Sequence, residues 1–469
     1  MQRLLTGILF SLITAPAALT VESIPADVGD PQQLGRGIQR TMTLLASSTP
    51  TQRNTVRILF YGQSITEQTW SKLVTEYLKN RFPSANLIIE NRALGGFSSQ
   101  RLVKTAETDL YDFNPDLLIF HVYGAHDDYE RIIERTRQRT TAEILIQTDH
   151  VGAKDDWQEE ETDPAKIGYK HWASFMNYKH LPAVITRYGC GSVDQRNLWK
   201  KHLTATKQEA QALLKDNVHL NDLGCEVMAA FAKAALVKRT DTTMDPMQCG
   251  YVRTYNVGKD APLTGDQLTL SIDGNRIDVI AGAKMSGAIQ VRIDGKAPSQ
   301  NPALYGFTKA LGKPGGKWPV VANLSSEASL LLETWTLNVA RDPQNEKRFT
   351  FDLIGSKTGA DGSGASDVRF VSTSRRIVID PEDWDVAYAL NLSGIKTIPD
   401  KLTARWEVVP RFVDSWTPSK GEANLENALT VAHGMHDGPH ELVLTGDVAG
   451  IQVIRVYAPK AFPCPAQTK

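Results

Sequence analysis

The chain has few cysteines, almost no net charge and, beyond its first residues, no long apolar run. Four cysteines occur among 469 residues, and no two of them form a Cys-x-x-Cys pair, which argues against a thiolate zinc site or a thioredoxin-like redox site. Lys and Arg number 52 and Asp and Glu 53, so no excess of charge favours binding to nucleic acid or to an anionic membrane. We therefore expect neutral or weakly charged small molecules or polymers as partners.

The N-terminus predicts export. A short basic start, MQR, precedes the apolar residues 4–19, which contain the small-residue site APA at residues 15–17. This is the pattern of a secretory signal peptide, residues 1–18, cleaved near Ala17 or Ala18. An N-terminal membrane anchor is the alternative, but the run is shorter than the about 20 residues that span a bilayer. We expect a soluble periplasmic or secreted protein with no membrane contact after cleavage.

Export makes disulfides chemically accessible. The four cysteines are Cys190, Cys225, Cys249 and Cys464, and four cysteines allow three connectivities. The pairing of Cys249 with Cys464 is the favoured one because these residues bracket the second half of the chain. Buried free thiols are the alternative.

The first large domain, residues 56–240, is predicted to be α/β. Apolar runs of strand length alternate there with helical patterns, which indicates β-α-β units and a parallel sheet. The expected strands are Val56–Tyr61, Asn86–Glu90, Asp116–Val122, Glu143–Gln147 and Gly191–Asp194. The expected helices lie at 70–78, 100–111, 129–140, within 165–187, at 198–214 and at 222–238. Together they predict a doubly wound, five-stranded parallel sheet.

The rest of the chain flanks this domain. Residues 19–55 form a leading segment with a short helix predicted within 34–46. Residues 250–465 alternate polar and apolar positions between glycine-rich breaks, which predicts an all-β sandwich or a jelly-roll-like region. Within it, the glycine-rich segment 356–365 is predicted to be a loop or a hairpin tip. A length of about 450 residues after signal cleavage fits more than one domain.

A serine follows the first predicted strand on a tight turn. In GQSIT, residues 62–66, Ser64 stands just before a helical pattern. Its hydroxyl would lie at the carboxyl edge of the sheet, where open parallel sheets bind ligands. Helix N–H groups beside it could stabilise negative charge. Taken alone, such a serine is more often a helix cap than a nucleophile.

Glycine-rich or polar segments follow two further strands. The segment NRALGGFS, residues 91–98, offers Gly95 and Gly96, whose backbone could approach a reacting centre and present an N–H group. A simple turn is the alternative interpretation. The segment GAHDD, residues 124–128, offers His126 and Asp127 as possible donors or substrate contacts.

An Asp and a His precede the last predicted helix. Asp216 stands three residues before His219, so its carboxylate could accept from imidazole Nδ1 and hold Nε2 toward a serine hydroxyl. The alternative is a capping turn in which Asn221 caps the helix and His219 is solvated.

These blocks resemble the SGNH (GDSL-like) hydrolase superfamily, whose blocks are a Gly-x-Ser turn, a glycine, Gly-x-Asn-Asp and Asp-x-x-His. The resemblance covers residues 56–238 and depends on the order of the blocks more than on any single one. It implies a flavodoxin-like fold with Ser64 as nucleophile, His219 as general base and Asp216 as its orienting group. It implies neither a metal nor an organic cofactor.

The oxyanion hole implied by the resemblance consists of the backbone N–H groups of Ser64 and Gly96, or of Gly95 in place of Gly96. Two residues depart from the family pattern. Gln63 replaces the usual Asp before the serine, and His126 replaces the Asn of the third block, which supplies a side-chain oxyanion donor. We expect His126 to donate in its place or to recognise the substrate.

The histidine also leaves room for another reaction. Asp127, Asp128 and Glu130 could then act as acids or bases. The alternative for these carboxylates is a solvated helix start, where negative charge is favourable.

Three weaker features complete the candidates. The run from His433 to His440 resembles a metal cluster by residue type, but a turn between two strands is favoured. Asp149, His150 and the acidic stretch 155–163 could form a rim over the site, with a solvated loop as the alternative. Tryptophans of the β region could stack on sugars, although most tryptophans of a β-sandwich are core; they are Trp318, Trp335, Trp384, Trp406 and Trp416.

The predicted function is that of an exported carbohydrate esterase removing acetyl or other small acyl groups from a glycan through an acyl-enzyme. The carbohydrate part depends on export, on the balanced charge and on a β region resembling the accessory modules of glycan-degrading proteins, which is an analogy of fold. One alternative is a glycosidase or polysaccharide lyase with a modified site on this fold. A second alternative is a non-catalytic glycan-binding protein with a vestigial site.

Overall fold

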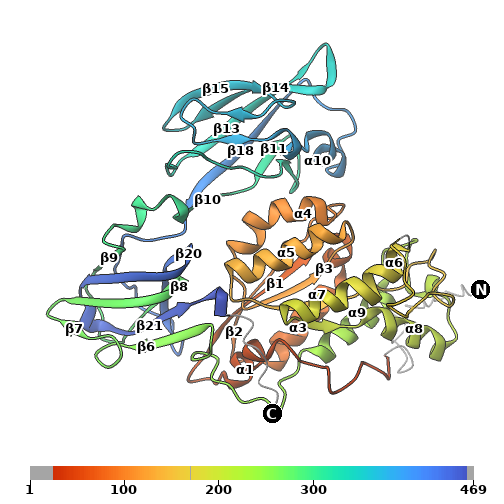
Figure 1. The fold of residues 1–469 in the computed structure, drawn as a ribbon, viewed down its shortest axis with the longest axis horizontal. Coiled ribbons are helices and arrows are strands. Elements are labelled where there is room, and N and C mark those ends of the chain that lie inside the picture. Colours follow the sequence, from red (N-terminus) through yellow and green to blue (C-terminus); the bar gives the residue numbers. More distant parts are fainter. Residues whose placement is uncertain (1–24, 170, 462–469) are drawn as a thin grey trace, which may run out of the picture.

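The computed structural model describes residues 25–169 and 171–461 (Figure 1). The predicted signal peptide, residues 1–18, and Cys464 lie outside these ranges. Within the described ranges, no helix is both long enough and apolar enough to cross a membrane.

Five parallel strands form the sheet of the α/β domain, in the order β2-β1-β3-β4-β5. The strands are β1 (Thr55–Gly62), β2 (Asn86–Asn91), β3 (Leu117–His121), β4 (Glu143–Gln147) and β5 (Gly191–Val193). Each lies where the apolar runs predict it, and the strand order is that of a flavodoxin-like, doubly wound sheet. The predicted fold class is confirmed.

Helices cover both faces of this sheet. They are α1 (Gln39–Ser47), α2 (Ser64–Glu67), α3 (Thr69–Arg81), α4 (Ser99–Ala106), α5 (His126–Arg139), α6 (Trp172–Ser174), α7 (Leu181–Tyr188), α8 (Gln195–Thr206) and α9 (Asp222–Ala235), with π-helical segments η2 (Glu107–Tyr111) and η3 (Phe175–His180). Val56, Ile58 and Phe60 of β1 face α1, α3, α8 and α9, whereas Leu59 and Tyr61 face α4, α5 and α7. Because strand side chains alternate between faces, a sheet covered on both sides needs such continuous apolar runs.

The leading segment packs on the α/β domain through α1. The backbone N–H groups of Arg40 and Thr41 donate to the two carboxylate oxygens of Glu143 at 2.8 and 2.7 Å. Burial raises the pKa of Glu143 to about 7. Since Glu143 begins β4, this contact fixes the leading segment at the amino ends of the strands, away from the carboxyl ends that carry the predicted site.

The β-rich region consists of two antiparallel sheets with separate apolar cores. The first sheet, which we call the flanking β body, has the order β19-β9-β20-β8-β21-β6, with β7 paired to β8. The second, which we call the inserted β body (residues 305–410), has the order β12-β11-β18-β13-β14-β15, with β10 paired to β18. The sequence predicted one β region and did not reveal this division.

The flanking body contains β6 (Val252–Asn256), β7 (Leu263–Thr264), β8 (Gln267–Ala281), β9 (Ile289–Ile293), β19 (Ser415–Trp416), β20 (Asn427–Gly446) and β21 (Ile451–Tyr457). The inserted body contains β10 (Tyr305–Phe307), β11 (Ala310–Lys313), β12 (Pro319–Val321), β13 (Thr334–Asp342), β14 (Asn345–Gly355), β15 (Gly359–Ala365), β18 (Lys401–Pro410) and the helix α10 (Val386–Leu392). A small sheet of β16 (Phe370–Val371) and β17 (Val378–Ile379) also belongs to it.

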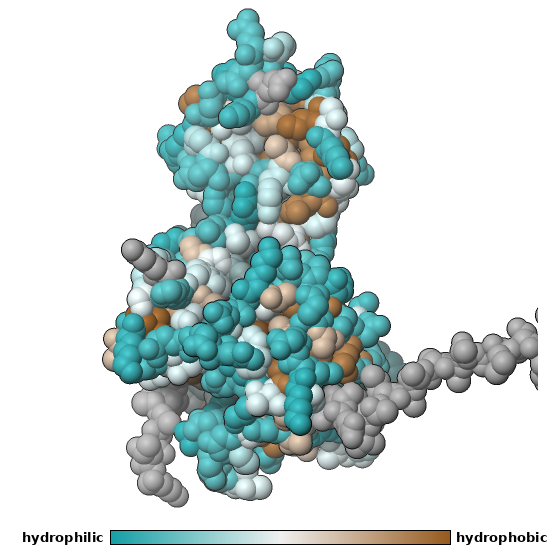
Figure 2. All heavy atoms as spheres, turned by 90° about the vertical axis from the view of Figure 1, so that its right-hand side faces the viewer, coloured by the Kyte–Doolittle hydropathy of each residue, from teal (hydrophilic) through white to brown (hydrophobic). Residues whose placement is uncertain are grey.

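The inserted body interrupts the flanking body in sequence. The chain leaves after β9 and returns at β19, and β8 pairs with β20 across this interruption. The entering and leaving strands lie side by side, because Tyr305 of β10 pairs with Pro410 of β18. Figure 1 shows the inserted body above α4 and α5, and Figure 2 shows it in space-filling form as the upper lobe, with a hydrophobic patch among hydrophilic residues on the face in view.

Three local predictions for this half of the chain need correction or completion. Of the two alternatives for residues 356–365, the hairpin tip is confirmed for residues 356–358, and the loop is wrong for the rest, because β15 pairs with β14 there. The predicted turn between His433 and His440 is a shift of register inside the continuous strand β20. No group of three His, Cys, Asp or Glu side chains suited to a metal ion occurs among the described residues. Cys249 forms no disulfide with another described residue, and its expected partner Cys464 lies outside the described residues.

Candidate active site

Ser64 begins α2 directly after β1, at the carboxyl edge of the sheet. The turn depends on Gly62, whose φ is +155°. A Cβ atom at Gly62 would lie 2.0 Å from the carbonyl oxygen of His121 in β3 and 2.4 Å from Thr66 Oγ1. Only glycine allows the backbone to pass this close to the neighbouring strand. Glycine at position 62 therefore lets the turn that carries Ser64 pack directly against the backbone of β3.

A chain of two hydrogen bonds joins Ser64 to the predicted His and Asp. Ser64 Oγ lies 2.9 Å from His219 Nε2, and His219 Nδ1 lies 2.9 Å from Asp216 Oδ2. With its proton on Nδ1, the imidazole donates to the carboxylate and accepts from the serine hydroxyl, the arrangement of a nucleophile, a base and an orienting group. Residues 155 positions apart are thus brought into proton-transfer contact.

The backbone of the turn holds the Asp216 carboxylate in place. Its second oxygen, Oδ1, accepts from the N–H groups of Val218 and His219 at 2.8 and 2.7 Å. These N–H groups, together with the His219 side chain, lower the pKa of Asp216 to about 2. Although its side chain is half exposed, the carboxylate is therefore oriented and ionised in neutral solution.

Gln68, which the sequence did not single out, ties the histidine turn to the serine helix. Its side-chain Oε1 accepts from the Leu220 N–H at 3.1 Å, and its Nε2 donates to the Leu220 carbonyl at 2.9 Å. Gln68 stands between α2 and α3, and Leu220 is buried and adjacent to His219. A glutamine four residues after a serine carries no motif, so only the folded chain reveals this clamp.

His150, which is buried, hydrogen-bonds to the backbone of the same turn, residues 216–219. Its Nε2 lies 2.7 Å from the Val218 carbonyl oxygen, and the ring is buried against Trp199. Burial lowers the pKa of His150 to about 4, so the imidazole is neutral and donates through Nε2–H. Asp149 is buried as well and bonds Asn177. The solvated-loop interpretation of Asp149 and His150 is therefore wrong, because both pack beneath the site.

The acidic stretch that follows folds over one buried arginine. Arg196 of α8 reaches the carboxylates of Asp155 and Glu160 at 2.9 and 2.8 Å and also donates to the His150 carbonyl at 2.8 Å. The arginine side chain is 2% exposed. The stretch is thus partly a structural element that holds the segment after β4, and neither a free rim nor a wholly solvated loop.

The Ser64 hydroxyl and the His219 imidazole line a surface groove of about 600 Å³. Other lining groups come from Glu67, Gln68 and Lys215. The His219 side chain is 34% exposed, so the base is accessible from solvent.

The predicted oxyanion glycines form a tight turn beside the serine. The Leu94 N–H donates to the Gly62 carbonyl at 2.9 Å, and the Phe97 N–H donates to the Leu94 carbonyl at 3.0 Å. Gly96, the third residue of this turn, has a φ of +81°, as the third position of a type II turn requires. The Gly95 N–H donates to Glu67 Oε1 at 2.7 Å, so of these two glycines only Gly96 has an N–H without an acceptor among the described residues. The described lining of the Ser64 groove includes neither glycine, and their oxyanion role stays a prediction.

His126 begins α5 but its ring packs into an aromatic cluster. Ring centroids of Trp172, Phe175 and His180 lie 5.9, 4.8 and 5.1 Å from the imidazole. Nε2 is buried and has no hydrogen-bond partner among the described residues, and burial lowers the pKa of His126. The described lining of the Ser64 groove does not include His126. Its role as a donor stays a prediction.

The carboxylates proposed as alternative acids or bases are mostly engaged. Asp128 pairs with Arg131 at 3.1 Å, and Glu130 pairs with Arg187 and accepts from Tyr188 Oη at 3.0 Å. Asp127 is exposed at the first turn of α5. These contacts fit the interpretation as a helix start with favourable charges.

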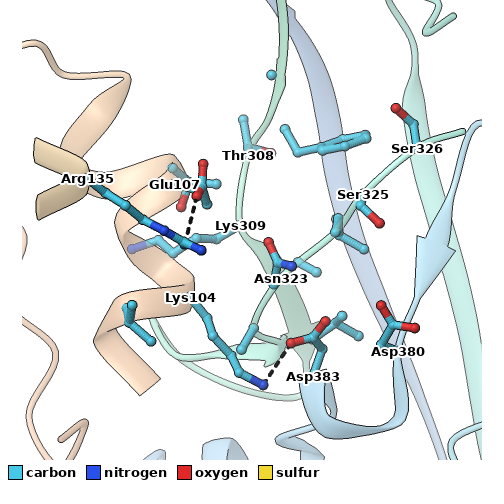
Figure 3. A pocket seen from close by; sticks show the side chains of 18 of the residues that line it. Lys104, Glu107, Arg135, Thr308, Lys309, Asn323, Ser325, Ser326, Asp380 and Asp383 are labelled. Carbon is cyan, nitrogen blue, oxygen red and sulfur yellow. Dashed lines mark hydrogen bonds and ion pairs between the residues drawn. The ribbon is translucent and has the colours of Figure 1, made fainter. Parts of the chain in front are cut away.

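A larger cavity of about 730 Å³ lies between the inserted body and the helices α4 and α5. Figure 3 shows ion pairs at its edge, with Lys104 Nζ 2.8 Å from Asp383 and Arg135 Nη1 3.4 Å from Glu107. Ser64 and His219 do not line it. The predicted site residues Ser64 and His219 thus line the smaller groove, whereas this cavity lies at the contact between the inserted body and the α/β domain.

Comparison with known proteins finds no matching family model and no matching curated protein. Solved structures are similar to the chain. A two-domain esterase active on acetylated mannans, co-crystallised with mannopentaose, is 13% identical over 91% of this chain and 96% of its own, with a TM-score of 0.34. An acetylxylan esterase from Geobacillus stearothermophilus, in a catalytic mutant, is 14% identical over 41% of this chain and 100% of its own, with a TM-score of 0.34.

A protein named as a GDSL-like lipase, from Parabacteroides merdae, is 16% identical over 40% of this chain and 98% of its own, with a TM-score of 0.33. Matches of this size assign no role to a residue, so the roles of Ser64, His219 and Asp216 depend on the geometry above. The chain is thus similar to solved structures of a GDSL-like lipase and of acetyl-mannan and acetylxylan esterases, and its α/β sheet has the flavodoxin-like strand order that the sequence resemblance implies.

Proposed function

We propose that the chain is an exported serine esterase that removes acetyl or other small acyl groups from a glycan. The observation that supports it most is the bonded series Ser64 Oγ, His219 Nε2 and Asp216, because a hydroxyl, an imidazole and a carboxylate in this order are the groups that acyl transfer needs.

In the proposed reaction, Ser64 Oγ attacks the ester carbonyl and its proton passes to His219 Nε2. The negative charge on the carbonyl oxygen is stabilised by the backbone N–H groups of Ser64 and Gly96. The tetrahedral intermediate expels the sugar oxygen, which takes the proton from His219, and an acyl-serine remains. Water then attacks the acyl carbon with His219 as base, and the acid and the free serine are released.

Two observations and one sequence prediction support a glycan as the carrier of the acyl group. The groove is open, so an acyl group on a long polymer can enter it. The N-terminal pattern of residues 1–18 predicts a signal peptide, and an exported protein would meet extracellular material. The similar two-domain esterase acts on acetylated mannans, which makes an acetylated neutral polysaccharide the first substrate to test.

The experiment compares the native protein with Ser64→Ala on acetylated and chemically deacetylated polysaccharides, and measures both acetate and new reducing ends. We expect acetate from acetylated substrate only, no new ends, and a loss of at least about 10³-fold in Ser64→Ala. Ser84→Ala, at the amino end of β2 on the opposite edge of the sheet, is the matched control and keeps the native rate. New sugar ends without acetate would replace the proposal by a glycosidase or lyase.

A further inference from the structure

Two side chains of the inserted β body donate hydrogen bonds to the glycine turn, residues 94–97. The proposed function assigns the Gly96 N–H of this turn to the oxyanion hole. Trp318 Nε1 donates to the Gly95 carbonyl at 2.8 Å, and Tyr388 Oη donates to the Gly96 carbonyl at 2.7 Å. Leu392 lies over Gly96 so closely that a Cβ there would come 2.7 Å from Leu392 Cδ2. Tyr388 and Leu392 stand four residues apart on α10 and so share one helix face.

We infer that Trp318 is a positioning residue for catalysis, which sets the direction of the Gly96 N–H by holding the Gly95 carbonyl of the same peptide group, and that Tyr388 supports this turn by holding the Gly96 carbonyl of the next peptide group. This inference rests on the proposed function, because it assigns the Gly96 N–H to the oxyanion. It gives the inserted body a part in the chemistry besides any part in holding substrate.

The physical reason lies in the peptide that joins Gly95 to Gly96. In a trans peptide, the C=O and the N–H point in opposite directions. Once Trp318 holds the Gly95 carbonyl, the Gly96 N–H must therefore point away from the inserted body. The other polar groups of the turn are bonded to Glu67, Leu94 and Tyr388, so the Gly96 N–H is the one left for a ligand.

A turn made of two glycines needs such external restraint. Type I and type II turns differ by a flip of the central peptide, and glycine at both central positions allows either. A flip would turn the Gly96 N–H toward the inserted body and present the Gly95 carbonyl on the side where the proposed function needs the N–H. Neither Gly95 nor Gly96 has a side chain to prevent this, so the Trp318 bond to the Gly95 carbonyl favours the observed orientation, and the Tyr388 bond to the Gly96 carbonyl holds the peptide that follows.

The inserted body is anchored firmly enough to act in this way. Lys317, next to Trp318, pairs with Glu67 of α2, which itself accepts from the Gly95 N–H. On the outer side, Arg101 of α4 pairs with Asp385 at 3.1 Å and its guanidinium lies 3.9 Å from the Tyr388 ring centroid. Trp318 and Tyr388 also pack against the apolar core beneath α4 and α5.

Trp318→Phe tests the inference, because it removes the indole N–H and keeps an aromatic ring. On a small acetyl ester we expect kcat to fall by about ten- to a hundredfold with KM changed less than about twofold, since only the transition state carries the oxyanion. The affinity of a boronic acid, which forms a tetrahedral anionic adduct with the serine, should fall by the same factor as kcat. Tyr388→Phe should produce the same pattern with a smaller loss.

Trp384→Phe is the matched control within the same body. The Trp384 ring packs on Phe351, and its Nε1 has no hydrogen-bond partner among the described residues. We expect native kcat and native boronate affinity from this variant. A native kcat in Trp318→Phe, or a lower kcat with unchanged boronate affinity, would overturn the inference while leaving the esterase assignment in place.

A second readout keeps the inference independent of activity. In protein labelled with ¹⁵N-glycine, Trp318→Phe should shift or broaden the amide resonances of Gly95 and Gly96, and Trp384→Phe should leave them unchanged. If the native protein hydrolyses no acetyl ester, the proposed function fails. Unchanged glycine resonances in Trp318→Phe would then remove the orienting role as well.

Discussion

Gln68 closes a two-bond ring with the backbone of Leu220, its Oε1 accepting at 3.1 Å and its Nε2 donating at 2.9 Å. No other described side chain bonds both backbone groups of this residue. Because Leu220 follows His219 directly and Gln68 follows the short helix that begins with Ser64, the ring determines the distance between the proposed nucleophile and its base.

Gln68→Ala should therefore lower kcat on a small acetyl ester by about ten- to a hundredfold through misplacement of the imidazole. Loss of two hydrogen bonds should also lower the free energy of unfolding by about 1–3 kcal/mol. Gln68→Glu keeps the acceptor and loses the donor, so its kcat should lie between that of Gln68→Ala and that of the native protein. Gln208→Ala, whose side chain bonds Thr206 away from the groove, should behave as native. Equal rates in Gln68→Ala and native would exclude the clamp.

Asp216→Asn should reduce kcat by about 10³–10⁴-fold. The amide can present one oxygen, and the two backbone N–H groups of the turn already require an acceptor at Oδ1. The NH₂ group would then face His219 Nδ1 and force the imidazole proton onto Nε2, where it cannot accept from Ser64. Steady-state kinetics of the purified variant measures this loss, and a rate within tenfold of native would argue against the orienting role.

The pH profile should show no ionisation of Asp216 above about pH 4. Backbone N–H groups lower the pKa of Asp216 to about 2 from an ordinary value of 3.8. A lowered carboxylate pKa adds stability that is fully present above 3.8 and is lost as the pH falls toward 2. The acid limb of kcat/KM at higher pH must therefore arise from another group. A limb that disappears in Asp216→Asn, with the rate plateau retained, would contradict this.

His150 should make the protein less stable as the pH falls from about 6.5 to about 4. Its pKa is lowered to about 4 by burial, so the unfolded chain takes up a proton that the folded chain refuses in this range, at a cost of about 3 kcal/mol. His433, with a pKa lowered to about 3 by burial and by Arg276 and Arg411, adds to the same dependence.

Urea unfolding at pH 7.5 and pH 4.5 measures the contribution of His150. His150→Phe should lose stability at pH 7.5, because the Val218 carbonyl loses its donor, and should show a smaller difference between the two pH values than native. His171→Phe, at an exposed position, is the control. An identical pH dependence in His150→Phe and native would exclude this account.

Gly62→Ala should unfold or severely destabilise the α/β domain, by more than about 2 kcal/mol. A Cβ at this position would lie 2.0 Å from the His121 carbonyl oxygen, so β1 and β3 would have to separate. Gly168→Ala is the matched control, since a Cβ there meets no atom within 4 Å. Thermal unfolding followed by circular dichroism compares them, and a native melting temperature in Gly62→Ala would refute the close approach.

Local pattern predicted the α/β domain well and the β region poorly, for a physical reason. Continuous apolar runs such as 117–121 and helix faces such as 70–78 show which side chains are buried, and each pattern lies within a few consecutive residues. The pairing of β8 with β20 across the inserted body leaves no such local record. The strand at 359–365 was missed because its glycines suggest a loop, although β14 supplies its backbone partners.

The candidate site divides in the same way. Ser64, Asp216 and His219 each follow a strand or precede a helix in a motif, and the fold brings them together. Gln68 makes two long-range hydrogen bonds to the Leu220 backbone and Trp318 makes one to the Gly95 carbonyl, and no spacing in the sequence encodes these contacts. His126 stood in a motif position, yet its ring is surrounded by aromatic side chains contributed by residues 169–180.

The chain enters the inserted body through β10 and leaves it through β18, and these two strands are adjacent, with Tyr305 paired to Pro410. Neighbouring ends are the condition under which a module can be exchanged in a host without disturbing it. Here, however, a replacement would have to bring its own two donors for Gly95 and Gly96. Under the inference above, a change in the substrate preference of this lobe keeps the catalytic rate only where the donors to the Gly95 and Gly96 carbonyls are also kept.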